Sequence, residues 1–327
     1  MICPGQSLKS FFEDQYIPLK LRGRADNTRR LYAFSVRNFS TFLQRDALLV
    51  DLTDDNVSRL MAWMMGRGLS PSSANKERSQ LLAIWRFACR KGFLQEWPDV
   101  DPEVQPDRDP RAWTMPQLES LFAACRATPG YIGPVPAGLW WETLHNLGWD
   151  TAERISPLRK SRWEWFDLDG GWVRVPAEFR KGKRKDMTYE LHAETVALLR
   201  RLRTFSKGDE VFPWPFSESH IYYRYAEVQR RAGLPSSRQF RFHCLRKSAA
   251  THGKRLGLDP QLMLGHEDGK TTRKYLDPTI CGQQSAAKIL PRPGLPAVTQ
   301  ELPRIGLTRR TIALVRRWFG RKAGLSR

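Results

Sequence analysis

A proline- and acid-rich segment at residues 98–112, PDVDPEVQPDRDPRA, limits how this chain can fold. The segment has no hydrophobic periodicity, so a helix or strand formed there would have no apolar face to bury. Its prolines favour an extended backbone. We therefore expect a linker at 98–112. A chain of 327 residues is long enough for a separate hydrophobic core on each side of it, which predicts two domains.

Residues 5–97 carry the pattern of a small all-helical bundle. Apolar residues follow polar start signals at helical spacing, as Tyr32, Val36 and Phe39 do. We predict four helices here, and we expect Pro18 to end the first of them. The expected helix starts are Ser7, Asn27-Thr28, Thr53 and Ser70-Pro71.

Residues 113–280 mix helices with a few short strands. Thr114 is expected to cap a helix. Alternating side chains predict strands at 172–175 and 187–191, joined by a turn that contains Lys181-Gly182-Lys183. The predicted fold class is therefore mainly α with a small β-sheet, with an all-α bundle followed by a mixed α/β domain. Further helices are expected at 137–150, 193–203 and 221–234.

The chain is strongly basic. Lys and Arg total 54 against 34 Asp and Glu, which gives a formal net charge of +20 and a pI of about 10.2. Such an excess points to a polyanionic partner, and nucleic acid is the leading candidate. The alternative on charge alone is a protein whose basic residues serve solubility or touch anionic lipid.

The cysteines indicate a reduced, cytoplasmic protein. There are five, and they are far apart with no C-x-x-C pair. Cys244 lies near His243 and His252, but a structural zinc site needs four ligands at tight spacing, so we expect neither a metal nor another cofactor. No apolar run reaches the length of a membrane span and the N-terminus lacks a signal-peptide pattern, so no membrane partner is expected.

The stretch 242–276 combines several residues suited to phosphodiester chemistry. His243 and Arg246 are three apart, so in a helix they share one face and can converge on one anion such as a phosphate. Gly265-His266 and then Tyr275 follow within 30 residues of Arg246. Taken alone, a His-x-x-Arg pair is more often a surface or capping pair, and a lone tyrosine is usually core. Their conjunction is what indicates a site.

This order of H-x-x-R, G-H and a tyrosine resembles the C-terminal active-site box of the tyrosine recombinases, the family of the phage integrases. The resemblance implies that DNA is cut and rejoined, in recombination or in the integration of a mobile element, through a phosphotyrosine at Tyr275. It also implies that Arg154 in TAERISPLRKSRW and Lys181 in EFRKGKRK belong to the site. Two positions depart from the family: Ala152 replaces a glycine, and Pro157 replaces a glutamate.

The resemblance, together with charge, implies a role for each catalytic residue. Arg154 and Arg246 would clamp the phosphate oxygens, and Lys181 would be the general acid for the leaving 5′ oxygen. His243 and His266 would assist proton transfer from Tyr275. Lys183 and Lys185 are rivals for the role of Lys181, and the hairpin could instead be a basic element that only touches backbone phosphates.

The helical bundle resembles, through SPSSANKERSQLLAIWRFACRKGFL, the core-binding domain found at the front of integrases. That implies a bundle that clamps one side of a DNA duplex, with the protein forming a dimer to tetramer on DNA. The expected DNA-binding residues are Arg29, Arg30, Lys76, Arg78, Lys183 and Arg241.

Other interpretations stay open at this point. A type IB topoisomerase shares the chemistry but acts as a monomer, and a relative with a dead site would only bind DNA. Residues 281–327 are predicted to form a proline-rich tail and a basic amphipathic helix, which suits a membrane surface, DNA or, by the resemblance, a neighbouring subunit. Alternative nucleophiles are Tyr222, Tyr223 and Tyr225.

Overall fold

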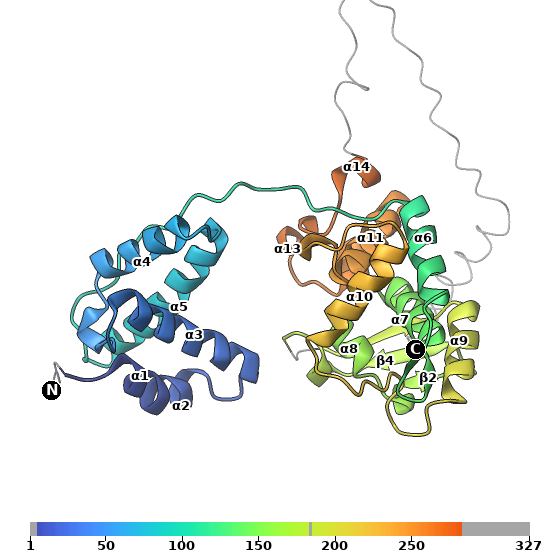
Figure 1. Ribbon diagram of the computed structural model, residues 1–327, viewed down its shortest axis with the longest axis horizontal. Coiled ribbons are helices and arrows are strands. Elements are labelled where there is room, and N and C mark those ends of the chain that lie inside the picture. The colour runs from blue at the N-terminus through green and yellow to red at the C-terminus, as the bar shows by residue number, and fades with distance from the viewer. Residues whose placement is uncertain (1–4, 183–184, 283–327) are drawn as a thin grey trace, which may run out of the picture. The chain divides into compact units, whose positions relative to one another are not determined.

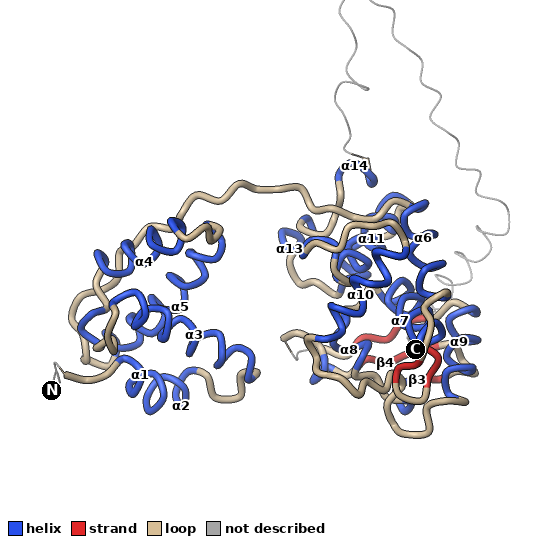
Figure 2. Tube along the Cα trace, in the orientation of Figure 1, coloured by secondary structure: helices blue, strands red, loops and turns tan. Residues whose placement is uncertain are grey.

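The computed structural model of the chain describes residues 5–182 and 185–282 (Figure 1). The chain divides between Arg108 and Asp109 into two compact units, each with its own hydrophobic core. Figure 2 separates the helices from the short strands, and every strand of the described residues lies in the second unit. The fold class is therefore mainly α with a small β-sheet, as predicted. The helix expected in the tail after residue 282 lies outside the described residues.

The first unit is the predicted helical bundle. Two of its expected caps are formed, since the Thr53 hydroxyl accepts a hydrogen bond from Asn56 N at 3.2 Å and the Ser70 hydroxyl accepts one from Ser73 N at 3.3 Å. Ser7 occupies the first N-cap position, but its side chain makes no capping bond. The elements are α1 (Leu8–Phe11), a π-helical turn (Phe12–Tyr16), α2 (Ile17–Lys20), α3 (Asp26–Leu43), a 3₁₀ turn (Leu49–Asp51), α4 (Asp54–Gly66) and α5 (Pro71–Arg90).

The prediction that Pro18 ends the first helix is wrong. The helical path continues through it to Lys20, because the π-helical turn precedes Pro18 and places it in the first turn of α2. A proline there costs little, since its missing N–H would have no partner in a first turn. The second predicted helix, α3, begins one residue earlier than expected, at Asp26.

The segment 98–112 contains no helix or strand, but both of its ends are held. At its start, Val100 is buried in the first core and its carbonyl accepts a hydrogen bond from Arg78 Nε at 2.7 Å. The Asn75 side chain both donates to and accepts from the backbone of Glu103, at 2.8 Å each. The stretch between Glu103 and the buried Ala112 is therefore the part of the segment with the fewest of these ties.

The second unit is built around α7 (Ala137–Thr151), whose Trp140, Trp141 and Leu144 are fully buried. Thr114 is the N-cap residue of α6 (Met115–Arg126), as predicted, and Gln117 Oε1 accepts a hydrogen bond from Thr114 N at 2.9 Å. The other α-helices of this unit are α8 (Ile155–Arg159), α9 (Ala193–Arg203), α10 (His220–Arg231), α11 (His243–Arg255), α12 (Pro260–Leu264), α13 (Gly269–Arg273) and α14 (Pro278–Cys281).

The sheet of the second unit has three antiparallel strands in the order β3 (Phe166–Asp167), β4 (Trp172–Val175) and β5 (Met187–Glu190). Val173 and Val175 are buried while their neighbours are exposed, which is the alternation that predicted this strand. Val173 pairs with Tyr189, and Val175 pairs with Met187. A separate two-stranded ladder joins β1 (Tyr131–Ile132) to β2 (Val135–Pro136).

The chain enters the second unit beside the place where the described part of it ends. Ala112 N donates to the buried carboxylate of Asp277 at 2.9 Å, and Asp277 N donates to Thr251 Oγ1 at 3.1 Å. Next to it, Trp113 N donates to Ser248 Oγ at 2.7 Å. These bonds attach the end of the linker and the segment after Tyr275 to the same helix, α11.

Within the described ranges, no helix is both long and apolar enough to cross a lipid bilayer.

Candidate active site

The structure brings three of the predicted residues together around the ring of a fourth, Tyr275. His243 and Arg246 lie on α11, His266 follows α12, and Tyr275 follows α13. The Tyr275 ring centre is 5.1 Å from that of His243, 4.8 Å from that of His266 and 5.4 Å from the guanidinium carbon of Arg246. These four residues span 32 positions of the sequence, from His243 to Tyr275. They form one cluster that contains a tyrosine hydroxyl, two imidazoles and a guanidinium.

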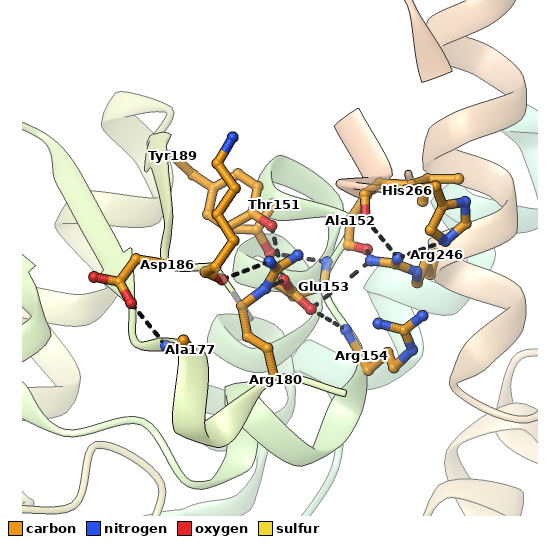
Figure 3. A network of polar contacts seen from close by, with 12 residues as sticks. Thr151, Ala152, Glu153, Arg154, Ala177, Arg180, Asp186, Tyr189, Arg246 and His266 are labelled. Atoms are coloured by element: carbon orange, nitrogen blue, oxygen red, sulfur yellow. Dashed lines mark hydrogen bonds and ion pairs between the residues drawn. The ribbon is translucent and has the colours of Figure 1, made fainter. Parts of the chain in front are cut away.

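Arg246 is fixed in direction by its contacts. The residue is only 1 % exposed, and its guanidinium donates to the carbonyls of Ala152 and, at 2.9 Å, Leu264. Its Nη2 also lies 3.3 Å from His266 Nε2 (Figure 3). Burial, and then the nearby charge of Arg154, lower the pKa of Arg246 from its ordinary value. Figure 3 shows the side chains of Arg154 and Arg246 on the same side of Glu153, an arrangement that suits a two-armed clamp for one anion.

Ala152 ends α7 in the left-handed conformation, with φ +47°, and is fully buried. Few residues other than glycine adopt this conformation. The alanine that stands where the family has glycine therefore keeps the backbone turn that glycine favours. This turn leaves the Ala152 carbonyl as an acceptor for Arg246.

Glu153 is a site residue that the sequence interpretation missed. It is 1 % exposed, and its carboxylate accepts hydrogen bonds from Arg180 Nε at 2.5 Å, Tyr189 Oη at 2.8 Å and Arg154 N at 3.0 Å (Figure 3). Arg246 Nη1 lies 3.8 Å from it. Burial alone would raise the pKa of Glu153, but the guanidiniums of Arg246 and Arg180 hold it below its ordinary value. The carboxylate is therefore ionised at neutral pH.

Arg154 and Lys181, the remaining predicted residues, lie on two other elements of the second unit. Arg154 is the half-buried N-cap residue of α8, and Lys181 is exposed in the turn after β4. The charges of both residues act on His243 and contribute to its lowered pKa. Of the two rivals of Lys181, Lys185 is exposed and Lys183 lies outside the described residues.

The two histidines are held neutral. Desolvation first, and the charge of Arg246 next, lower the pKa of both His243 and His266 to about 4. A guanidinium can only donate, so His266 Nε2 beside Arg246 is an acceptor. The proton of His266 is then assigned to Nδ1, which lies 3.2 Å from Thr272 Oγ1. Thr272 therefore sets the orientation of the ring.

We predict that both imidazoles titrate well below the ordinary histidine value of about 6.5. Because the pKa is lower in the folded protein than in the unfolded chain, the stability these groups contribute is fully present above about pH 6.5 and is lost as the pH falls toward 4. The check is an NMR titration of the six histidine rings, with His243→Gln and His266→Gln assigning the two signals. A midpoint near 6.5 for either ring would contradict the charge arrangement described above.

The side chains of Cys244 and His252 contact backbone carbonyls of the protein. Burial raises the pKa of the Cys244 thiol to about 12, which disfavours the thiolate that a metal binds. His252 Nε2 lies 2.9 Å from the Trp113 carbonyl. Among residues 5–182 and 185–282, no group of three or more His, Cys, Asp or Glu side chains is placed to hold a metal ion.

The residues predicted to contact DNA differ in how free their side chains are. Arg30 is exposed, and Arg241 is exposed over the Tyr222 ring, 4.9 Å from its centre. Lys76 pairs with Glu77 at 3.3 Å. Arg78 holds the Val100 carbonyl, so its described contact is within the first unit. The remaining candidates are Arg29, 3.9 Å from Asp26, and Lys183, which lies outside the described residues.

Comparison with known proteins agrees with this geometry. The model of the phage integrase family matches residues 113–280. The tyrosine recombinase XerD of Pseudomonas aeruginosa is 26% identical over 276 residues, which cover 78% of this chain and 87% of that protein. The tyrosine recombinase XerA of Saccharolobus solfataricus is 23% identical over 271 residues, covering 79% and 84% respectively.

Solved structures share the fold at lower identity. A lambda integrase dimer bound to a COC′ core site matches with a TM-score of 0.65 and 19% identity, covering 83% of this chain and 77% of that one. The Tn1549 transposon integrase in complex with a circular intermediate DNA matches with a TM-score of 0.66 and 14% identity, covering 83% and 95%. These likenesses extend over both units of the described chain.

Proposed function

This chain belongs to the phage integrase family and is a tyrosine-type site-specific recombinase, and we propose that Tyr275 is the nucleophile that forms its 3′-phosphotyrosine bond with DNA. The observation that carries the proposal is that His243, His266 and Arg246 all lie against the half-buried Tyr275 ring. Because Tyr275 lies in the cluster of its own chain, we further propose that it cleaves in cis.

The proposed cleavage exchanges one phosphodiester for another. The Tyr275 oxygen loses its proton and bonds to phosphorus, and the bond from phosphorus to the 5′ oxygen breaks. Negative charge builds on the nonbridging oxygens, where the guanidiniums of Arg154 and Arg246 stabilise it. Because the phosphotyrosine keeps the bond energy, rejoining needs only attack by a free 5′ hydroxyl.

Two proton transfers accompany this exchange. The tyrosine proton needs an acceptor, and His243 is neutral at physiological pH because its pKa is lowered to about 4. The leaving 5′ oxygen needs a donor, and Lys181 is exposed in the turn after β4, where a DNA strand could reach it. We therefore assign His243 and His266 to the tyrosine side of the reaction and Lys181 to the leaving-group side.

We propose duplex DNA as the partner, bound by an oligomer of this chain. The lambda integrase neighbours are a dimer bound to a core site and a tetramer bound to a Holliday junction, and both units of this chain are represented in those folds. The exposed side chains of Arg30 and Arg241 and the net charge of +20 support binding to backbone phosphates. Phosphate contacts do not specify a sequence, so the site is to be found by enrichment from random duplexes.

Binding to this DNA should weaken steeply with salt. If about six phosphates are neutralised, log affinity should fall against log salt with a slope of about −5. Fluorescence anisotropy at several NaCl concentrations measures the slope, and Arg30→Gln should reduce it by about one. If DNA affinity did not change with salt concentration, binding through contacts between basic side chains and backbone phosphates would be ruled out.

Lys181→Ala should lose cleavage of a normal substrate by about a hundredfold or more, the usual contribution of a general acid. A substrate with sulfur in place of the 5′ bridging oxygen should restore the rate, because a thiolate leaves without a proton. Lys183→Ala is the matched control and should cleave the normal substrate well. If Lys183→Ala lost cleavage of the normal substrate and sulfur restored it, while Lys181→Ala cleaved normally, the general acid would be Lys183.

A further inference from the structure

Arg180, the residue immediately before Lys181, differs from the exposed lysines beside it by being buried. Only 9 % of it is exposed, whereas Lys181 and Lys185 are exposed. Its Nε donates to Glu153 Oε1 at 2.5 Å (Figure 3). Its Nη1 donates to the Lys185 carbonyl at 3.0 Å. One side chain therefore attaches both ends of the turn that carries Lys181 to a buried carboxylate.

Glu153 connects this turn to the rest of the catalytic cluster. The same carboxylate accepts hydrogen bonds from Tyr189 on β5 and from the backbone N–H of Arg154, and it lies 3.8 Å from Arg246 Nη1. The contacts thus come from the hairpin, from the start of α8 and from α11. If the hairpin shifted relative to Arg154 and Arg246, the buried ion pair between Arg180 and Glu153 would break and leave an uncompensated charge.

The Arg180 guanidinium also lies against the residue before His266. A Cβ atom added at Gly265 would be 2.8 Å from Arg180 Nη2 and 3.4 Å from Met187 Sδ. Gly265 has φ +60°, which also favours glycine. The hairpin is therefore in close contact with the backbone that leads into His266.

Among the described residues, no hydrogen bond or ion pair holds the Lys181 side chain in place. It is exposed in the turn, and its long side chain is free to sample many rotamers. A general acid works only within hydrogen-bond reach of the atom it protonates, and a displacement of about 1 Å can cost about a hundredfold in rate. The position of the turn backbone therefore decides how well Lys181 can act.

We propose that Arg180 is a positioning residue for Lys181. It anchors the turn between β4 and β5 to Glu153, and so holds Lys181 at a fixed place relative to Arg154 and Arg246. This inference rests on the proposed function, in which Lys181 is the general acid. Arg180 itself touches neither DNA nor the reacting atoms in this proposal.

The test compares two nicked duplexes that differ only in an oxygen or a sulfur at the 5′ bridging position. Arg180→Lys keeps the charge opposite Glu153 but lacks the second arm of the guanidinium, so it is expected to fold and to hold the turn less well. Arg180→Gln removes the charge as well. Under single turnover, Arg180→Lys should form adduct with the oxygen substrate about tenfold or more slowly than wild type, yet react with the sulfur substrate within about threefold of it.

Arg200→Gln is the matched control. Arg200 lies on α9 with its side chain 54% exposed and pairs with Asp169 at 2.5 Å, so the substitution removes the same charge without touching the cluster. It should react with both substrates at wild-type rates. Thermal melting and DNA affinity are measured for every variant, so that cleavage rates are compared only between proteins that are folded and bound to DNA.

The outcomes distinguish failure of this proposal from failure of the proposed function on which it rests. Equal losses on both substrates would mean that Arg180 acts through the fold or the clamp, and unchanged oxygen rates would mean that it positions nothing; either result overturns the proposal. The same sulfur-rescued loss in Arg200→Gln would do so too, by reducing the effect to overall charge. Failure of sulfur to rescue Lys181→Ala would instead remove the general acid itself, and no adduct in wild type would refute the proposed function.

Discussion

Tyr275→Phe should bind its DNA site with wild-type affinity and form no covalent adduct. The substitution removes one hydroxyl, and the ring that packs between His243 and His266 is kept. Without the oxygen nothing can bond to phosphorus, so the loss should be complete. The measurement uses a nicked substrate whose short 5′ fragment diffuses away, which traps the adduct for detection on a denaturing gel.

Tyr223→Phe provides the control, because Tyr223 is exposed on α10 and is one of the alternative nucleophiles. It should form adduct at the wild-type rate. An adduct that persists in Tyr275→Phe, and that peptide mass maps to Tyr222, Tyr223 or Tyr225, would show that another tyrosine attacks. Tyr225 is the least suited of these, since it is 1 % exposed and packs in the hydrophobic core.

Arg246→Ala should slow cleavage by about a hundredfold or more, corresponding to roughly 3 kcal/mol of lost transition-state stabilisation. The same change should destabilise the fold, because the carbonyls of Ala152 and Leu264 lose their buried donor. Single-turnover cleavage measures the first effect and chemical denaturation the second.

Arg246→Lys distinguishes the two effects, since it keeps a charge in the cluster but not the fork that reaches both carbonyls and a phosphate. It should recover part of the stability and little of the rate. A folded Arg246→Ala protein that cleaves at the wild-type rate would exclude this residue from the phosphate clamp.

Local signals predicted most of the fold. Thr53, Ser70 and Thr114 stand at the starts of helices because a hydroxyl before an apolar periodic run satisfies free N–H groups, and this needs no knowledge of distant residues. The alternation in β4 predicted its buried face for the same reason. Pro18 misled because the preceding π-helical turn, which has no simple sequence signal, moved it into a tolerated position.

The buried network of the site was out of reach of such local signals. Glu153 and Arg180 are 27 positions apart, and Arg180 stands within a run of basic residues that has the appearance of a solvated turn. Only one hint was present: a glutamate directly before Arg154, in a segment where the family's usual glutamate is replaced by Pro157. The proposed catalytic residues were predicted from the resemblance to the family, whereas the partners that orient their side chains could be seen only in the folded chain.

The bond between Ala112 and Asp277 sets the length at which the second unit can be cut from the chain. A fragment that starts at Trp113, where the family match begins, lacks the Ala112 N–H and removes one donor from a buried carboxylate two residues beyond Tyr275. A fragment that starts at Asp109 keeps that donor and falls at the division between the units. The last residues of the linker therefore help to hold the segment that carries the proposed nucleophile, and a shortened form of this enzyme should keep them.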